Sequence, residues 1–206
     1  MLENGRKGGF CVLADIEAAF YALGVSHTVA FLAADGVQTL DLTGPREIFA
    51  GASEGLRRLS RPGGYTLLVL SPDGGPVRTS SGLGIVADGP WSRAVQAQTV
   101  LIPGGDGIEA LLKDATAAAQ VAEVTRGAQR VGSICTGAFL LAAAGLLDGR
   151  QATTHWAYCR QLARHYPAVT VLEDPIFVRD GRLITSAGVT AGCLLYTSDA
   201  ADDLYR

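Results

Sequence analysis

A cysteine stands where a predicted strand turns directly into a predicted helix, within residues 130–149 (RVGSICTGAFLLAAAGLLDG). A short apolar run typical of a buried strand ends just before Cys135, and residues 138–147 are strong helix formers. At such a turn the side chain meets the unpaired N–H groups of the helix start, which lower the pKa of a thiol. We therefore expect a reactive thiolate at Cys135. The alternative is a buried core cysteine, since free cysteines are among the most buried residue types.

The cysteines of the chain show no pattern that would bind a metal. Cys11, Cys135, Cys159 and Cys193 form no CxxC pair, and no Cys/His spacing suits zinc. Because no convincing signal peptide precedes them, we expect free thiols in a reducing cytoplasm and no metal site.

The composition is that of a globular protein. The chain has 206 residues, of which 48% are hydrophobic and 18% charged, and its formal net charge is -3. This length allows one domain with a sizeable core, and the charge offers no basic surface for nucleic acid or an anionic membrane. The longest apolar stretch, residues 134–147, is shorter than the roughly 18 residues of a membrane span, so we expect a core helix there.

Apolar runs that alternate with helical patterns predict the elements that must position Cys135. Besides the strand before Cys135, strands are expected at residues 28–34, 65–70, 77–81, 83–87, 99–102, 151–154, 169–172, 176–179 and 183–185. Besides the helix after it, helices are expected at residues 46–52, 108–112, 115–129 and 155–165. This alternation indicates an α/β three-layer sandwich with a mostly parallel central sheet.

The two ends of the chain do not continue this pattern. Residues 1–26 do not resemble the start of an α/β sheet, and we expect an N-terminal extension with a short helix at 14–23 as one interpretation. Residues 193–206 (CLLYTSDAADDLYR) resemble the translated adapter of a sequencing library joined to a truncated gene. We therefore expect one domain over residues 27–192, a non-native tail and a natural chain that continues further.

Six motifs in a fixed order identify the family that the chain resembles. They are DGVQTLDLTGP (35–45), SPDGGPVRTSSGL (71–83), LIPGG (101–105), SICTGAFLLAAAGLLDGR (133–150), ATTHW (152–156) and ITSAGVTAG (184–192). Together they resemble the ThiJ/PfpI superfamily over nearly all of the predicted domain. The resemblance implies a flavodoxin-like fold of the class I glutamine amidotransferase type.

Two branches of this superfamily are similar to the chain. TGAFLLAAAGLLDGR, residues 165–182 and TSAGVTAG most resemble the N-terminal ligand-sensing domain of GlxA-like regulators, which an AraC-type helix-turn-helix domain follows. We favour this branch, with a small-molecule ligand and with DNA bound only through a missing C-terminal domain. LDLTGP, ICTG and ATTHWAY are also similar to isocyanide hydratase, a cofactor-free lyase that hydrates isonitriles to N-formamides. The sequence leaves open whether the chain is an enzyme.

The resemblance to the hydratase implies roles for three residues. Cys135 would be the nucleophile, Asp41 of LDLTGP would handle protons, and Thr136 would offer its hydroxyl and N–H beside the sulfur. Asp41 has a plainer interpretation, in which it caps the helix that starts near Pro45 or bonds local backbone.

Three further residues are predicted to bind the ligand. The N–H groups of Gly104 and Gly105, which follow a parallel strand, would face an intermediate, and His155 matches a histidine that many superfamily members place near their cysteine. The glycines could equally be turn residues, and His155 a structural histidine. Because Thr136 directly follows Cys135 where hydrolase-type members have histidine, the pattern argues against a Cys-His protease or amidase.

A third hypothesis makes Cys135 a redox sensor, since thiolates at such turns oxidise readily. In every one of these interpretations the resemblance implies a homodimer and no cofactor.

Overall fold

The computed structural model describes residues 26–188, and every structural statement below concerns this part of the chain. The helix predicted at 14–23, the tail at 193–206 and Cys193 lie outside the described residues. Within them, no helix is long and apolar enough to cross a membrane.

A seven-stranded sheet forms the centre of the described structure, in the order β10-β11-β7-β6-β1-β2-β5. Its strands are β1 (Ser26–Leu32), β2 (Gly64–Ser71), β5 (Gly89–Pro90), β6 (Thr99–Ile102), β7 (Arg130–Ile134), β10 (Phe177–Asp180) and β11 (Leu183–Ser186). All neighbours are parallel except β10 and β11, which form an antiparallel hairpin. Beside it lie two small sheets, antiparallel β3 (Val77–Arg78) with β4 (Gly84–Ile85), and parallel β8 (Gln151–Ala152) with β9 (Thr170–Val171).

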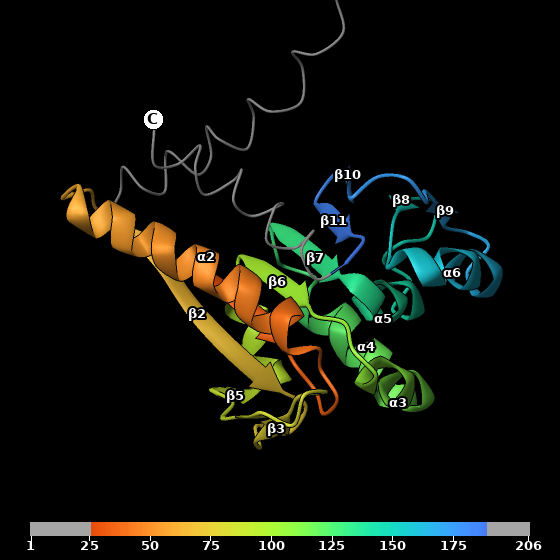
Figure 1. Cartoon of the computed structure of the whole chain (residues 1–206), viewed down its shortest axis with the longest axis horizontal. Coiled ribbons are helices and arrows are strands. Elements are labelled where there is room, and N and C mark those ends of the chain that lie inside the picture. The colour runs from red at the N-terminus through yellow and green to blue at the C-terminus, as the bar shows by residue number, and fades with distance from the viewer. Residues whose placement is uncertain (1–25, 189–206) are drawn as a thin grey trace, which may run out of the picture.

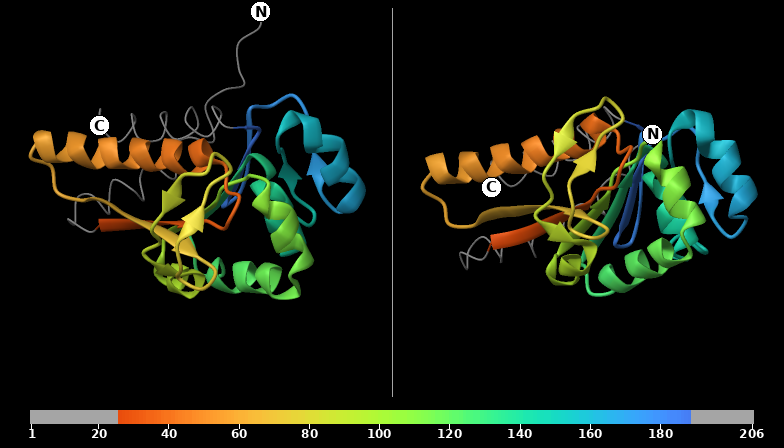
Figure 2. Two further views of the ribbon diagram at one scale, coloured as in Figure 1. Left: turned by 60° about the horizontal axis from the view of Figure 1, so that its bottom comes forward. Right: turned by 90° about the horizontal axis from the view of Figure 1, so that it is seen from below.

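Helices cover both faces of the central sheet, which confirms the predicted three-layer sandwich. The long helix α2 (Thr39–Arg58) covers one face, and α3 (Gly107–Lys113), α4 (Ala115–Val124) and α5 (Ala138–Ala143) cover the other (Figures 1 and 2). Beyond α5, α6 (Cys159–His165) lies with β8 and β9 at one end of the molecule (Figure 1). Three short 3-10 helices complete this part of the chain, η1 (Trp91–Gln96), η2 (Cys135–Gly137) and η3 (Trp156–Tyr158).

The core consists of one cluster of buried side chains on each face of the sheet. Successive residues of a strand point to opposite faces, so in β1 Val29 and Phe31 join the cluster under α2, whereas Ala30 and Leu32 join the cluster under α4 and α5. Because both faces are covered, the central strands are apolar runs without alternation, which is why they could be recognised in the sequence.

The start of α2 corrects the helix predicted from residue 46. The helix begins at Thr39, because the side-chain oxygen of Gln38 accepts a hydrogen bond from Thr39 N at 2.9 Å and caps it. Pro45 consequently lies inside α2 and not in its first turn, and Asp41 belongs to the first turn of the helix. The earlier start brings Asp41 to the carboxyl end of the sheet, where the candidate site lies.

The structure differs from the predicted elements in smaller ways after α2. The helix predicted over 115–129 ends at Val124, where Arg182 donates hydrogen bonds to the carbonyl oxygens of Thr125 and Ala128 at 2.7 and 2.8 Å. The sequence analysis missed β5 and η1 altogether. There the indole N–H of the buried Trp91 reaches backbone carbonyls of the central sheet.

Candidate functional site

Cys135 occupies the predicted turn between strand and helix, and its backbone is strained. β7 ends at Ile134, and Cys135 starts η2, which leads into α5. Its φ of 55° is left-handed, a conformation that costs a non-glycine residue about 1–2 kcal/mol. Gly137 lets the turn approach the sheet closely, since a Cβ there would collide with the carbonyl oxygen of Ile102. The sequence-based prediction of a tight turn at this cysteine is confirmed.

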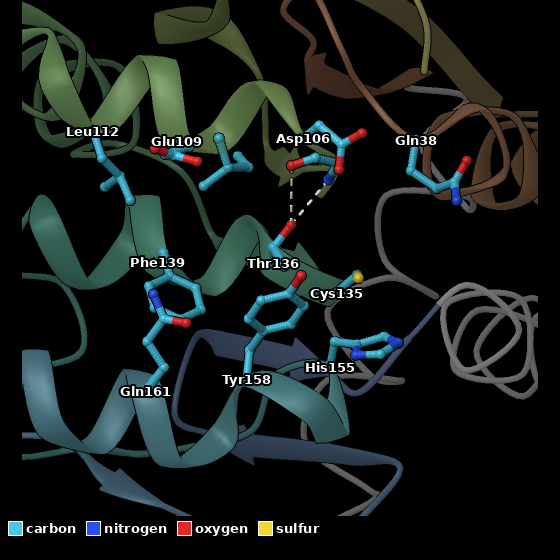
Figure 3. A pocket seen from close by; sticks show the side chains of 12 residues that line it. Gln38, Asp106, Glu109, Leu112, Cys135, Thr136, Phe139, His155, Tyr158 and Gln161 are labelled. Carbon is cyan, nitrogen blue, oxygen red and sulfur yellow. Dashed lines mark hydrogen bonds between the residues drawn. The ribbon is translucent and has the colours of Figure 1, made fainter. Parts of the chain in front are cut away.

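A cavity of about 590 Å³ opens beside this turn. Figure 3 shows that Cys135, His155 and Gln38 lie at one end of it, and Leu112, Phe139 and Gln161 at the other. The complete lining consists of Gln38, Gly105, Asp106, Ile108, Glu109, Leu112, Cys135, Thr136, Phe139, His155, Tyr158 and Gln161. Cys135, a residue that is 8% exposed, therefore borders a space large enough for a small organic molecule.

Asp41 is fully buried and is not among the residues that line this cavity. Its Oδ2 accepts a hydrogen bond from Gly104 N at 3.1 Å, whereas Oδ1 has no partner of hydrogen-bond geometry among the described residues. Burial raises the pKa of Asp41 to about 6, against the opposing effects of the Gly104 N–H and the neighbouring Cys135 thiol. Since Gln38 caps α2 and the Asp41 carboxyl accepts from Gly104 N of a distant turn, the plainer interpretation of Asp41 as a helix cap or a partner of local backbone is wrong, and its role in the site stays a prediction.

The pKa of Cys135 contradicts the expectation drawn from the helix start. Burial, and then the negative charge of Asp41, raise it to about 12, although the Thr136 N–H and hydroxyl act in the opposite direction. The predicted lowered pKa is therefore wrong for this structure, because desolvation and a carboxylate outweigh the N–H groups of the turn. Both shifts favour the protonated forms, and the thiol is the weaker acid of the two.

The glycine turn after β6 holds the side chains of Asp41 and Thr136 in place. Gly104 N donates to Asp41, and Gly105 N donates to Thr136 Oγ1 at 2.9 Å. A Cβ on Gly104 would lie 2.6 Å from Thr136 N and 2.9 Å from Asp41 Oδ2, so only glycine fits. The prediction that both N–H groups face a ligand needs correction, because both are engaged within the protein and orient Asp41 and Thr136 instead.

His155 lines the cavity but is not paired with the cysteine. Its Nδ1 accepts from Ala157 N at 3.3 Å, at the start of η3, and its ring packs against Trp156 and Tyr158. Among residues 26–188 no hydrogen bond joins His155 to Cys135. The arrangement agrees with the argument against a Cys-His hydrolase, and a ligand-binding role for His155 stays a prediction.

Several lining residues escaped the sequence analysis. Gln38 precedes α2, Phe139 belongs to α5, and Tyr158 and Gln161 come from η3 and α6. Only the last two carried a signal, since residues three apart share one face of a helix. The others could not be recognised without the packing of these elements around Cys135.

The charge of the lining is acidic. Among the described residues, Asp106 and Glu109 are its only ionisable members other than Cys135, His155 and Tyr158, and no lysine or arginine lines the cavity. Glu109 pairs with Lys113 at 2.8 Å outside the lining. No cluster of three or more potential metal ligands occurs within the described range.

Comparisons with known proteins agree with this architecture. A family model described as DJ-1/PfpI family matches residues 27–198. An uncharacterized protein in the cpoL 5' region of Streptomyces lividans is 42% identical over 69% of this chain and 96% of its own length. The isonitrile hydratase of Pseudomonas putida is 37% identical over 80% of this chain and 66% of its own length.

A transcriptional regulator is also similar. The HTH-type transcriptional regulator CdhR of Pseudomonas aeruginosa is 38% identical over 62% of this chain and 37% of its own length. The chain spans less than half the length of the HTH-type regulators that it matches. Among solved structures, a ThiJ/PfpI family protein from Pseudomonas syringae has a TM-score of 0.73 and 31% identity, over 86% of this chain and 69% of that one.

Proposed function

Because this chain belongs to the DJ-1/PfpI family, we propose that it contains the small-molecule-sensing domain of an AraC-type, GlxA-like transcriptional regulator. The observation that carries the proposal is the similarity to several HTH-type regulators over less than half of their length, as expected where one domain of a longer protein is shared. DNA is then contacted by a helix-turn-helix domain outside these 206 residues. The net charge of -3 fits this arrangement, because the 206 residues themselves have no excess of basic side chains for binding DNA. The regulator works as a cytoplasmic homodimer.

The cavity at Cys135 is the sensing site in this proposal. Asp106 gives it negative charge without a lysine or arginine in the described lining, Glu109 adds a carboxylate that is paired with Lys113, and Leu112 and Phe139 give it an apolar end. Such a lining favours an uncharged or cationic ligand with an apolar part and disfavours an anion. Cys135, which lines the cavity, then recognises the polar end of the ligand, and Asp41 acts through that thiol.

The intact gene tests this proposal. It should encode roughly a hundred further residues with helix-turn-helix motifs, and the full-length protein should bind DNA upstream of its own gene in a gel-shift assay. Small molecules that raise the melting temperature of the sensing domain should alter that binding. A native stop codon shortly after residue 192 would contradict the proposal.

A second candidate function is isonitrile hydration, which the pairing of Asp41 with Cys135 supports. The isonitrile hydratase of Pseudomonas putida is 37% identical, and the site holds a thiol beside a carboxylate whose pKa of about 6 suits proton transfer near neutral pH. Because the thiol itself is protonated at that pH, it needs Asp41 as a base to become a nucleophile.

The residues allow a balanced reaction. Asp41 takes the thiol proton as the sulfur adds to the terminal carbon of the isonitrile, and the proton then passes to that carbon, which forms a thioimidate. Water adds to the same carbon, the carbon–sulfur bond breaks, and the nitrogen takes a proton, which releases the N-formamide and restores the thiol. Thr136, held by Gly105, keeps an N–H beside the sulfur throughout.

Turnover of a simple isonitrile decides between the two functions. In the hydratase case, formamide production should disappear in Cys135→Ala and fall strongly in Asp41→Asn. A folded full-length protein that turns over no isonitrile would end the second proposal and leave the first intact.

A further inference from the structure

Thr154 contacts the strained turn at Cys135 and does not itself line the cavity. Its hydroxyl donates to the carbonyl oxygen of Cys135 at 2.7 Å, and its side chain is fully buried. We propose that Thr154 is a positioning residue, which holds Cys135 in the left-handed conformation and thereby keeps the sulfur against Asp41 and Thr136. This proposal rests on the proposed function, in which the sulfur of Cys135 is the reactive atom of the site.

The strain at Cys135 explains why such a support is needed. A left-handed φ brings the Cβ of a non-glycine residue too close to a backbone oxygen, so the residue relaxes unless its surroundings hold it. Because φ is the rotation about the N–Cα bond, relaxation displaces the carbonyl group of the same residue. A hydrogen bond to that carbonyl opposes the displacement directly, and a buried acceptor loses more when its donor is removed than an exposed one does.

Thr154 can act as a fixed point because its own segment is anchored on both sides. Thr153 N donates to Thr185 Oγ1 of β11 at 2.8 Å. The thiol of Cys159, at the start of α6, lies 3.6 Å from the carbonyl oxygen of Thr154 and 3.7 Å from that of His155, and donates to them. The donor of the critical hydrogen bond is therefore tied to the central sheet and to α6.

The same contact couples two segments that line the cavity. Thr154 directly precedes His155, which lies at the same end of the cavity as Cys135 (Figure 3). One hydrogen bond thus fixes the position of Cys135 relative to the segment that carries His155. Loss of this bond should alter the surroundings of the sulfur before it alters the fold.

The test follows the rate at which iodoacetamide alkylates Cys135 as a function of pH, measured by intact-protein mass spectrometry with Cys135→Ala as the background. In Thr154→Val the sulfur should leave Asp41, so its pKa should fall and the rate at pH 8 should rise at least about tenfold. Thr154→Ser keeps the hydroxyl and should stay within about twofold of the unmodified protein. Neither turnover nor DNA binding is required, so a failure here is distinguishable from a failure of the proposed function.

The neighbouring threonine provides a matched control. Thr153 is equally buried, but its hydroxyl makes only a 3.5 Å contact with the carbonyl oxygen of Thr154. Thr153→Val should leave the pH profile unchanged. A Thr154→Val protein with the original profile, a Thr154→Ser protein that behaves like Thr154→Val, or an equal effect of Thr153→Val would each overturn the assignment. If Thr154→Val and Thr154→Ala both fail to fold while Thr153→Val folds, the hydroxyl supports the whole fold and the positioning role is refuted.

Discussion

The carboxyl group of Asp41 and the thiol of Cys135 interact at the carboxyl ends of the central strands, where burial favours the protonated form of each. Burial is the largest cause of both raised pKa values, about 6 for Asp41 and about 12 for Cys135. The thiol is the weaker acid of the two, so the Asp41 carboxylate is the base that can remove its proton. Any chemistry or sensing at this site starts from a thiol next to a carboxylate.

The first prediction concerns the reactivity of the Cys135 thiol when the Asp41 carboxylate is replaced by an uncharged amide. In Asp41→Asn the pKa of the thiol should fall, because a negative charge that opposes thiolate formation is gone. Alkylation by iodoacetamide at pH 8 should accelerate roughly tenfold, the effect of one pKa unit on the thiolate fraction. An unchanged or slower rate in a folded variant would show that Asp41 does not control the sulfur.

The second prediction concerns stability against pH. The pKa of Asp41 is about 6 when folded and 3.8 ordinarily, so the folded state favours the protonated carboxyl. The contribution of this group is fully present below pH 4 and is lost as the pH rises to about 6, a difference of about 3 kcal/mol. Urea unfolding of the original protein and of Asp41→Asn from pH 4 to 8 should show this loss only in the original. If the free energies of unfolding of the two proteins changed with pH in the same way, this prediction would be contradicted.

His27 should produce the opposite dependence. It is buried at the amino end of β1, with Nε2 2.9 Å from Thr99 Oγ1 and close to Arg130. Burial, and then the charge of Arg130, lower its pKa from 6.5 to about 3. The stability from neutral His27 should be lost as the pH falls from 6.5 towards 3, by up to about 5 kcal/mol.

Denaturant unfolding of His27→Gln measures this effect. The variant should lose less stability than the original protein between pH 7 and 4. His165→Gln, which replaces an exposed histidine, is the control and should follow the original curve. Equal acid sensitivity of all three proteins would rule out the buried histidine as its cause.

Two glycines predict opposite effects of the same substitution. Gly104→Ala would push a Cβ against Thr136 N and Asp41 Oδ2, so the turn must shift, and we expect a destabilisation of about 2–4 kcal/mol. Gly51 lies within α2, and a methyl group on its Cα would meet no atom within 4 Å, so Gly51→Ala should stabilise by up to about 1 kcal/mol. Thermal unfolding compares them, and similar melting temperatures would contradict the close packing at Gly104.

The last prediction tests the charge of the cavity. A methanethiosulfonate reagent with a trimethylammonium group should modify Cys135 several times faster than one of similar size with a sulfonate group, since Asp106 and Glu109 attract the cation. Asp106→Asn combined with Glu109→Gln should reduce this preference, and added salt should weaken it. A faster reaction with the sulfonate would refute an uncharged or cationic ligand. Cys135→Ala provides the background from the other cysteines.

Local sequence was sufficient for the turn at Cys135, because an apolar strand followed at once by helix formers allows few other geometries. It was misleading for the start of α2, since the side chain of Gln38 caps the helix upstream of the proline that looked like its beginning. It was also misleading for the charge state of Cys135. The N–H groups of a helix start can be read locally, whereas burial and the Asp41 carboxylate come from the packing of distant elements.

By itself, the sequence determined the three-layer α/β architecture, the position of Cys135 at the strand–helix turn and the family, because these follow from apolar periodicity and from motifs in a fixed order. The tertiary structure decided which groups surround the sulfur. It buried Asp41 beside Cys135, engaged the N–H groups of Gly104 and Gly105 within the protein and placed the Thr154 hydroxyl against the carbonyl oxygen of Cys135. The physical reason is that desolvation and hydrogen bonding depend on contacts between residues far apart in the chain, and such contacts exist only after the sheet and its helices have packed together.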